Sequence, residues 1–178
     1  MADFMNRMMR AVTLDPKLYE EIRKDRTAMG QAVLVVILSA IASGIGSITR
    51  GGILGIILGT VVSLFGWVFW AYLIYFIGTK LFAEPDTKTN LEEFLRSIGF
   101  SSSPGIIRVL GIIQPIASTV FLIAAVWMLV AMVVAVKQTL DYKSTGRAVA
   151  VCVISWLIQM LVLVFLWSIF FWKAHQPA

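Results

Sequence analysis

The sequence has 178 residues, of which 59% are apolar and 14% charged, with a net charge of +5 and a mean hydropathy of +0.87. These values place it among integral membrane proteins. The single cysteine, Cys152, excludes an internal disulfide, and the absence of an interleaved basic and aromatic surface excludes nucleic acid as a partner.

Residues 1–26 are expected to form a cytosolic amphipathic arm. In residues 1–12, Phe and Met side chains recur at helical spacing opposite Arg7 and Arg10. This pattern suits a short helix that lies on an anionic surface.

A second arm helix is expected after Asp15, which can act as its N-cap, with Pro16 in the first turn. Its apolar face is formed by Leu18, Tyr19 and Ile22. This face is interpreted either as a docking surface for a protein partner or as the contact of a membrane-resting helix that orients the first span. Short amphipathic helices beside a span are commonly anchors, which favours the second interpretation.

Four runs without a charged side chain predict membrane crossings at residues 27–49, 51–79, 115–136 and 148–172. The run 51–79 has 29 residues and would reach about 43 Å as a helix, more than the roughly 30 Å of hydrocarbon in a bilayer. Its second half is rich in aromatic residues, which collect where lipid meets water.

The start of the second crossing carries small residues four apart, at Gly51, Gly55 and Gly59. Such spacing lets helix backbones approach closely in lipid. The glycines are therefore expected to pack helices together, either within the chain or at a homodimer face. Packing within the chain is favoured because the motif alone is weakly specific.

A further crossing is predicted as short and broken. Asn90 and Glu93 form a capping box at the start of a helix, and residues 101–105 interrupt it before a second half-helix that runs to about residue 113. This segment is the third of five expected spans.

Two polar residues fall within the predicted spans, Arg108 in the broken third and Gln159 in the last. A guanidinium in a span is costly unless it reaches the interface or finds a partner, and an amide needs a hydrogen bond. The favoured interpretation is a snorkelling arginine and an interhelical bond from the glutamine. The alternative is a polar intramembrane site formed by both residues.

No catalytic, metal or cofactor site is expected. The ten acidic residues all lie in the arm and in cytosolic loops, and the chain has one histidine and one cysteine. The sequence favours a non-enzymatic membrane protein that organises the bilayer or docks a protein, including a second copy, at its cytosolic face. The alternative is a small transporter or lipid-moving protein that uses the broken third helix.

The order of features resembles the bacterial branch of the Yip1-domain membrane proteins. The likeness rests on LDPKLYEEIRKD in the arm, on the Gly-rich second span, and above all on WMLVAMVVAVKQTLDYKSTGRAVAVCVISWLI at residues 127–158. The resemblance implies five spans with a cytosolic N-terminus. Eukaryotic members act in membrane traffic and associate with Rab-type GTPases, but their Asp-Leu-Tyr-Gly-Pro signature is absent here, so GTPase binding is not carried over.

The expected fold is therefore an all-α, polytopic helical bundle: a 1–26 arm followed by a five-helix Yip1-like domain over 27–178. With the N-terminus in the cytosol, twelve of the 15 basic residues lie inside, in agreement with the positive-inside rule. This topology places the C-terminus outside, in what we expect to be a bacterial inner membrane.

Overall fold

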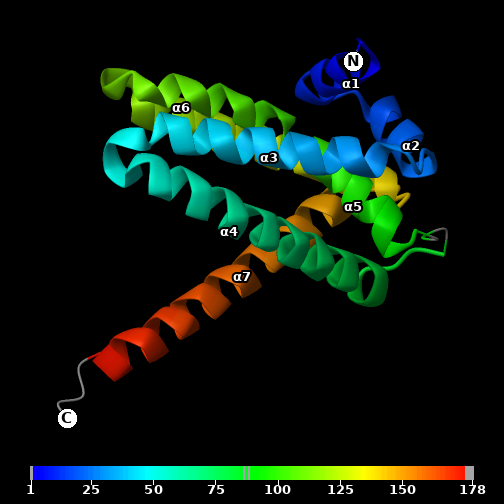
Figure 1. Cartoon of the computed structure of the whole chain (residues 1–178). Coiled ribbons are helices and arrows are strands. Elements are labelled where there is room, and N and C mark those ends of the chain that lie inside the picture. Colours follow the sequence, from blue (N-terminus) through cyan, green and yellow to red (C-terminus); the bar gives the residue numbers. More distant parts are fainter. Residues whose placement is uncertain (1, 86, 88, 175–178) are drawn as a thin grey trace.

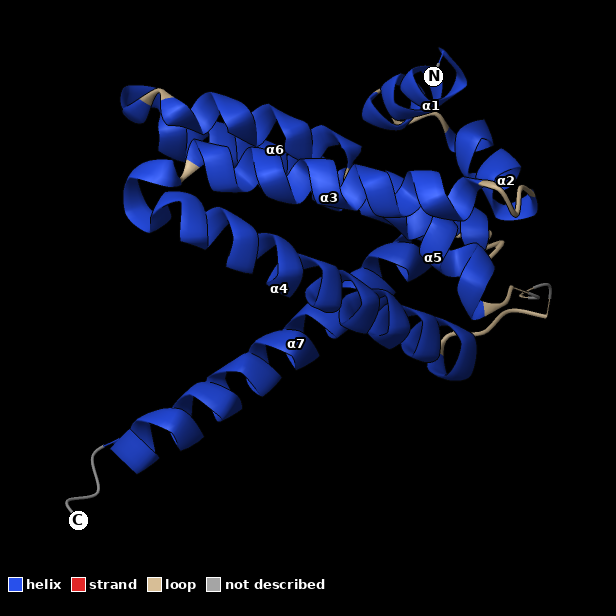
Figure 2. Cartoon of the chain, viewed as in Figure 1, coloured by secondary structure: helices blue, strands red, loops and turns tan. Residues whose placement is uncertain are grey.

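The computed structural model describes residues 2–85, 87 and 89–174, and these residues form helices and no strand (Figure 2). The α-helices are α1 (Ala2–Val12), α2 (Pro16–Lys24), α3 (Ala28–Gly46), α4 (Ile48–Phe76), α5 (Leu91–Phe100), α6 (Ala117–Thr139) and α7 (Thr145–Ala174). Three further segments of the described chain have a different winding: η1 (Ile77–Leu81) is a π-helix, and η2 (Ser103–Ile112) and η3 (Gln114–Ile116) are 3₁₀ helices. The expectation of an all-α chain is confirmed.

The long helices form a bundle whose two ends differ (Figure 1). The arm helices α1 and α2 lie with α5 at one end, and the α3–α4 turn lies at the other. Helix α7 diverges from the bundle toward the C-terminus. The segments expected in the cytosol thus gather at one end.

Helix α1 is held against the chain by a buried arginine. Arg7 is 7% exposed, and it donates to Asp25 at 2.8 Å, to Gln31 at 3.1 Å and to Glu21 at 3.2 Å. Hydrogen bonds from Thr27 and then from Arg7 lower the pKa of Asp25 to about 2. Because this carboxylate is ionised at neutral pH, the ion pair persists under physiological conditions.

Helix α2 is fixed at both of its ends. Asp15 accepts a hydrogen bond from the Lys17 amide at 3.0 Å, as its expected N-cap role requires. At the other end Arg96 of α5 donates to the Arg23 carbonyl at 2.7 Å, and a cation is favourable at a helix C-terminus. Arg23 in turn pairs with Asp141, which ties α2 to the turn after α6.

The broken third segment begins as expected and ends differently. Asn90 accepts from the Glu93 amide at 2.9 Å and donates to the Glu93 carboxylate at 2.9 Å. After the break, however, residues 103–112 form a 3₁₀ helix of ten residues. Since a 3₁₀ helix rises about 2.0 Å per residue instead of 1.5 Å, the tighter winding lengthens a short segment to about 20 Å.

Helix α3 runs alongside α5 and η2 in the same direction, with small residues at the contact. A Cβ on Gly99 would lie 2.7 Å from the Ala32 Cβ. Further along, a Cβ on Gly105 would overlap the Ser39 hydroxyl, and a Cβ on Gly46 would overlap the carbonyl oxygen of Arg108. The two backbones therefore approach as closely as glycine allows.

Four helical segments are long and apolar enough to cross a membrane, within the part of the chain that the structure describes. They are Ala28–Gly46, Gly52–Leu81, Gln114–Thr139 and Thr145–Val162. The predicted third span is not among them, because α5 and η2 each have ten residues. Helix length therefore establishes four candidate spans, and the expected count of five is not established by it.

We predict that Arg7→Gln frees α1. The substitution removes the charge that holds α1 to Asp25 and Glu21, so hydrogen exchange of the amides in residues 3–12 should become faster. Lys17→Gln is the matched control, because Lys17 lies exposed on the same arm. Equal exchange in the two variants would show that the ion pair does not hold the helix.

We predict that Gly46→Ala destabilises the bundle, because the new Cβ would overlap the Arg108 carbonyl and force η2 away from α3. Overpacking of this kind costs about 1–3 kcal/mol and should lower the thermal midpoint measured in detergent. Gly59→Ala is the control, since a Cβ there meets nothing within 4 Å and alanine favours the helix. An unchanged midpoint for Gly46→Ala would contradict the close contact.

Candidate functional site

A polar cavity of about 270 Å³ lies inside the bundle, between α3, α4, η2, α6 and α7. Its lining includes the polar side chains of Ser39, Ser63, Trp67, Ser102, Arg108 and Gln159. Apolar residues, among them Trp70, Met128 and Met132, complete the wall. The cavity is partly open, and it brings together polar groups from α3, α4, α7 and the η2 segment.

Arg108 is placed here by the 3₁₀ winding of η2. With three residues per turn, side chains three apart lie in one row, so Gly105, Arg108 and Gly111 follow one another along the helix. Gly105 and Gly111 pack closely against Ser39 and the Gly46 carbonyl, respectively. Arg108 is therefore fixed beside α3 at the cavity.

The guanidinium of Arg108 is poorly satisfied. Its Nη2 donates to the Met128 sulfur at 2.8 Å, and thioether sulfur is a weak acceptor. Its Nε is buried without a partner among the described residues. No carboxylate belongs to the cavity lining in the described chain, so no counter-ion is supplied from within.

Two further polar atoms at the cavity are unsatisfied. The Trp67 Nε1 and the Gln159 Oε1 are both buried and have no hydrogen-bond partner within the described residues. Buried polar atoms in folded proteins nearly always have a partner, so orphaned atoms gathered in one cavity point to a ligand or to water. The Arg108 Nε and the Trp67 Nε1 can only donate, whereas the Gln159 Oε1 can only accept, so the cavity suits a ligand that carries a negatively charged acceptor and also a donor.

The structure brings Arg108 and Gln159 to one cavity although they are 51 residues apart in the sequence. The interhelical bond expected of Gln159 is not made through its Oε1 in the described structure. Whether the two residues bind a ligand stays a prediction. Sequence reasoning missed Trp67 and Ser39, because an aromatic residue and a serine in a span carry no distinct signal.

Leu18, Tyr19 and Ile22 lie in the interior of the chain, each with 0% exposure. They pack where α2 meets α5 and α6, and burial raises the pKa of Tyr19. Their face is therefore occupied by the chain itself. A partner could dock on these three residues only if α2 left its place.

The predicted packing glycines have no close neighbours in the described chain. A Cβ on Gly55 or on Gly59 would meet nothing within 4 Å, and the surroundings of Gly51 lie outside what the structure describes. Close packing occurs instead at Gly46, Gly99, Gly105 and Gly111. The sequence pattern that could have predicted this packing is the recurrence of glycine every six residues, at 99, 105 and 111.

No group of three or more His, Cys, Asp or Glu residues that could hold a metal ion occurs in the described residues. His175, the single histidine, lies outside them. The cavity offers one cation, the Trp67 donor and the Gln159 amide, which has both donors and an acceptor.

Comparison with models of protein families gives a match. The model of the Yip1 domain matches residues 10–167, which is most of the chain. Neither a search of curated proteins nor a search of solved structures returned a match. The chain belongs to the Yip1-domain family of membrane proteins.

Proposed function

We propose that this protein is a non-enzymatic integral membrane protein that binds the phosphate of an anionic lipid in its polar cavity and thereby organises or moves lipid. The observation that carries the proposal is the meeting in one cavity of the Arg108 Nε and the Trp67 Nε1, two buried donors without a partner in the described chain, with the Gln159 amide beside them.

A phosphate meets the needs of this cavity. An arginine within a bilayer is costly, by about 2.5–3.5 kcal/mol on insertion scales, unless a partner compensates its charge. Guanidinium matches phosphate oxygens with two parallel hydrogen bonds, and the indole and amide donors can add others. The cost of burying Arg108 is then offset by the ligand.

The surroundings favour a lipid as the source of the phosphate. Helix α4 forms one wall of the cavity. No residue in the most apolar stretch of Gly52–Leu81 is buried inside the described chain, so this helix faces the bilayer. A lipid head group can enter from that side with its chains still in hydrocarbon. A free phosphate ion is insoluble in hydrocarbon, whereas a lipid is already part of the bilayer that faces α4.

The lining of the polar cavity also argues against an enzyme and against a proton-coupled transporter. Catalysis by acid, base or nucleophile needs titratable groups converging on one point, and the cavity lining in the described residues holds no Asp, Glu, His or Cys. Transport coupled to protons commonly uses an embedded acid, and the acidic residues lie in the arm, in the loops and in the first turn of α5.

We further propose five crossings with the N-terminus in the cytosol of a bacterial inner membrane. Two observations support the third crossing. Helices α5 and η2 run in the same direction as α3, and together they are about 35 Å long, which is enough to cross a bilayer. The gathering of α1, α2 and α5 at one end supports the orientation, as does the charge distribution.

Docking of a protein partner or of a second copy at the cytosolic face is a second proposal. The buried position of Leu18, Tyr19 and Ile22 gives it a specific form, in which α2 leaves the bundle to bind. The lipid-binding proposal needs no such rearrangement.

We predict that Arg108→Gln weakens the binding of phosphatidylglycerol to the purified full chain about tenfold or more, because hydrogen bonds to charged groups contribute about 1.5–3 kcal/mol. Gln159→Leu should weaken binding by a smaller factor. Native mass spectrometry with stepwise addition of lipid measures the effect.

The matched control for this experiment is Arg26→Gln, which removes an exposed arm charge of the same kind. Equal loss in Arg26→Gln and Arg108→Gln would mean nonspecific attraction and would contradict the site. Displacement of the lipid by inorganic phosphate at equal concentration would reassign the ligand to free phosphate.

We predict that the C-terminus is external. A reporter that fluoresces only in the cytosol, fused after Ala178, should be silent because five crossings carry the chain outside. Ala178 itself lies outside the described residues. A bright fusion would rule out the five-span topology and leave the cavity unaffected.

A further inference from the structure

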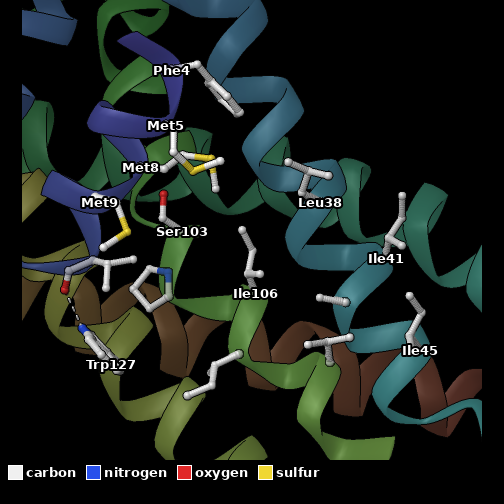
Figure 3. A pocket seen from close by; sticks show the side chains of 15 residues that line it. Phe4, Met5, Met8, Met9, Leu38, Ile41, Ile45, Ser103, Ile106 and Trp127 are labelled. Atoms are coloured by element: carbon white, nitrogen blue, oxygen red, sulfur yellow. Dashed lines mark hydrogen bonds between the residues drawn. The ribbon is translucent and has the colours of Figure 1, made fainter. Parts of the chain in front are cut away.

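A second cavity, of about 570 Å³, lies beneath α1 (Figure 3). Its walls come from α1, α3, η2 and Trp127 of α6, and it shares no lining residue with the polar cavity. Trp127 donates from its indole nitrogen to the Val12 carbonyl at 2.9 Å, which fixes α1 as the cover. We call this cavity the α1 groove.

The α1 groove is apolar except at one point. Its cover consists of flexible methionines, Met5, Met8 and Met9, opposite Leu38 and Ile41 of α3. Methionine adapts its shape to irregular apolar ligands. None of the 15 lining residues is charged, so a charged ligand group would not be stabilised there.

The exception is the hydroxyl of Ser103, which is 1% exposed and has no hydrogen-bond partner in the described structure. The nearby Ser101 and Ser97 hydroxyls each donate to a backbone carbonyl of their own helix, at 2.7 and 3.2 Å. In Figure 3 the Ser103 oxygen points toward the methionines of α1. A buried donor left free in an apolar groove marks where a ligand acceptor would sit.

We propose that the α1 groove holds one acyl chain of a membrane phospholipid, whose ester carbonyl accepts a hydrogen bond from Ser103. From Ser103 the groove continues along Ile41 to Ile45, one residue before the end of α3, so a chain can follow it into the bilayer. Ile41 and Val109 are each 36% exposed, which leaves this side open to lipid.

The ester is favoured over a free fatty acid by charge. A carboxylate beside Ser103 would lie in a lining without a cation, whereas an ester carbonyl is a neutral acceptor. This site is independent of the phosphate proposed at Arg108.

The test uses the full chain in nanodiscs that contain a phospholipid with a diazirine in one acyl chain. After irradiation, labelled positions are identified by peptide mass spectrometry. We expect Met5, Met8 and Met9 to be labelled more strongly than Ile53 and Val62, which are exposed on α4 and report ordinary surrounding lipid.

Variants make the test specific. Ile41→Trp fills the groove and should reduce α1 labelling to the level of α4, while Leu34→Trp, on the same helix and outside the groove, should not. Ser103→Ala should weaken labelling about threefold to tenfold, the range of a single neutral hydrogen bond. Arg108→Gln should leave it unchanged.

Three outcomes would overturn the proposal. Labelling of α1 at the level of α4 in the unaltered chain would mean surrounding lipid only. Preferential labelling by a diazirine fatty acid at equal concentration would overturn the ester assignment. Loss of α1 labelling in Arg108→Gln would show that the groove is not a separate site.

Discussion

The close contact of α3 with α5 and η2 is the constraint on which the rest of the structure depends. In lipid no hydrophobic force draws helices together, so packing must come from backbones that approach closely. Gly46, Gly99 and Gly105 provide that approach, and side chains at these points would force the helices apart. The contact keeps a short, polar segment inside the bundle, where an independent helix of its length could not remain.

Both cavities follow from this contact. Held against α3, the 3₁₀ helix η2 presents Arg108 toward one cavity and Ser103 toward another. Each cavity contains a buried polar atom without a partner in the described chain. Their linings differ in character, since one contains a cation and several polar groups while the other is uncharged, and this difference suits a phosphate in the first and an acyl chain in the second.

Sequence patterns were sufficient to predict the features that depend only on neighbouring residues. The caps at Asp15 and Asn90 and the break after Phe100 follow from neighbouring residues, and the structure contains all three. The 3₁₀ winding of η2 was not predictable, because it depends on contact with α3. The predicted glycine contacts at Gly55 and Gly59 are absent from the described chain, since spacing alone does not say which helix lies opposite.

The most direct measurement of the central claim is an experimental structure of the full chain in bilayers of phosphatidylglycerol. The account predicts a phosphate whose oxygens lie about 3 Å from the Arg108 guanidinium, within the cavity that Gln159 and Trp67 also line. A cavity filled only by water or by rearranged side chains, with Arg108 turned to the membrane surface, would contradict it.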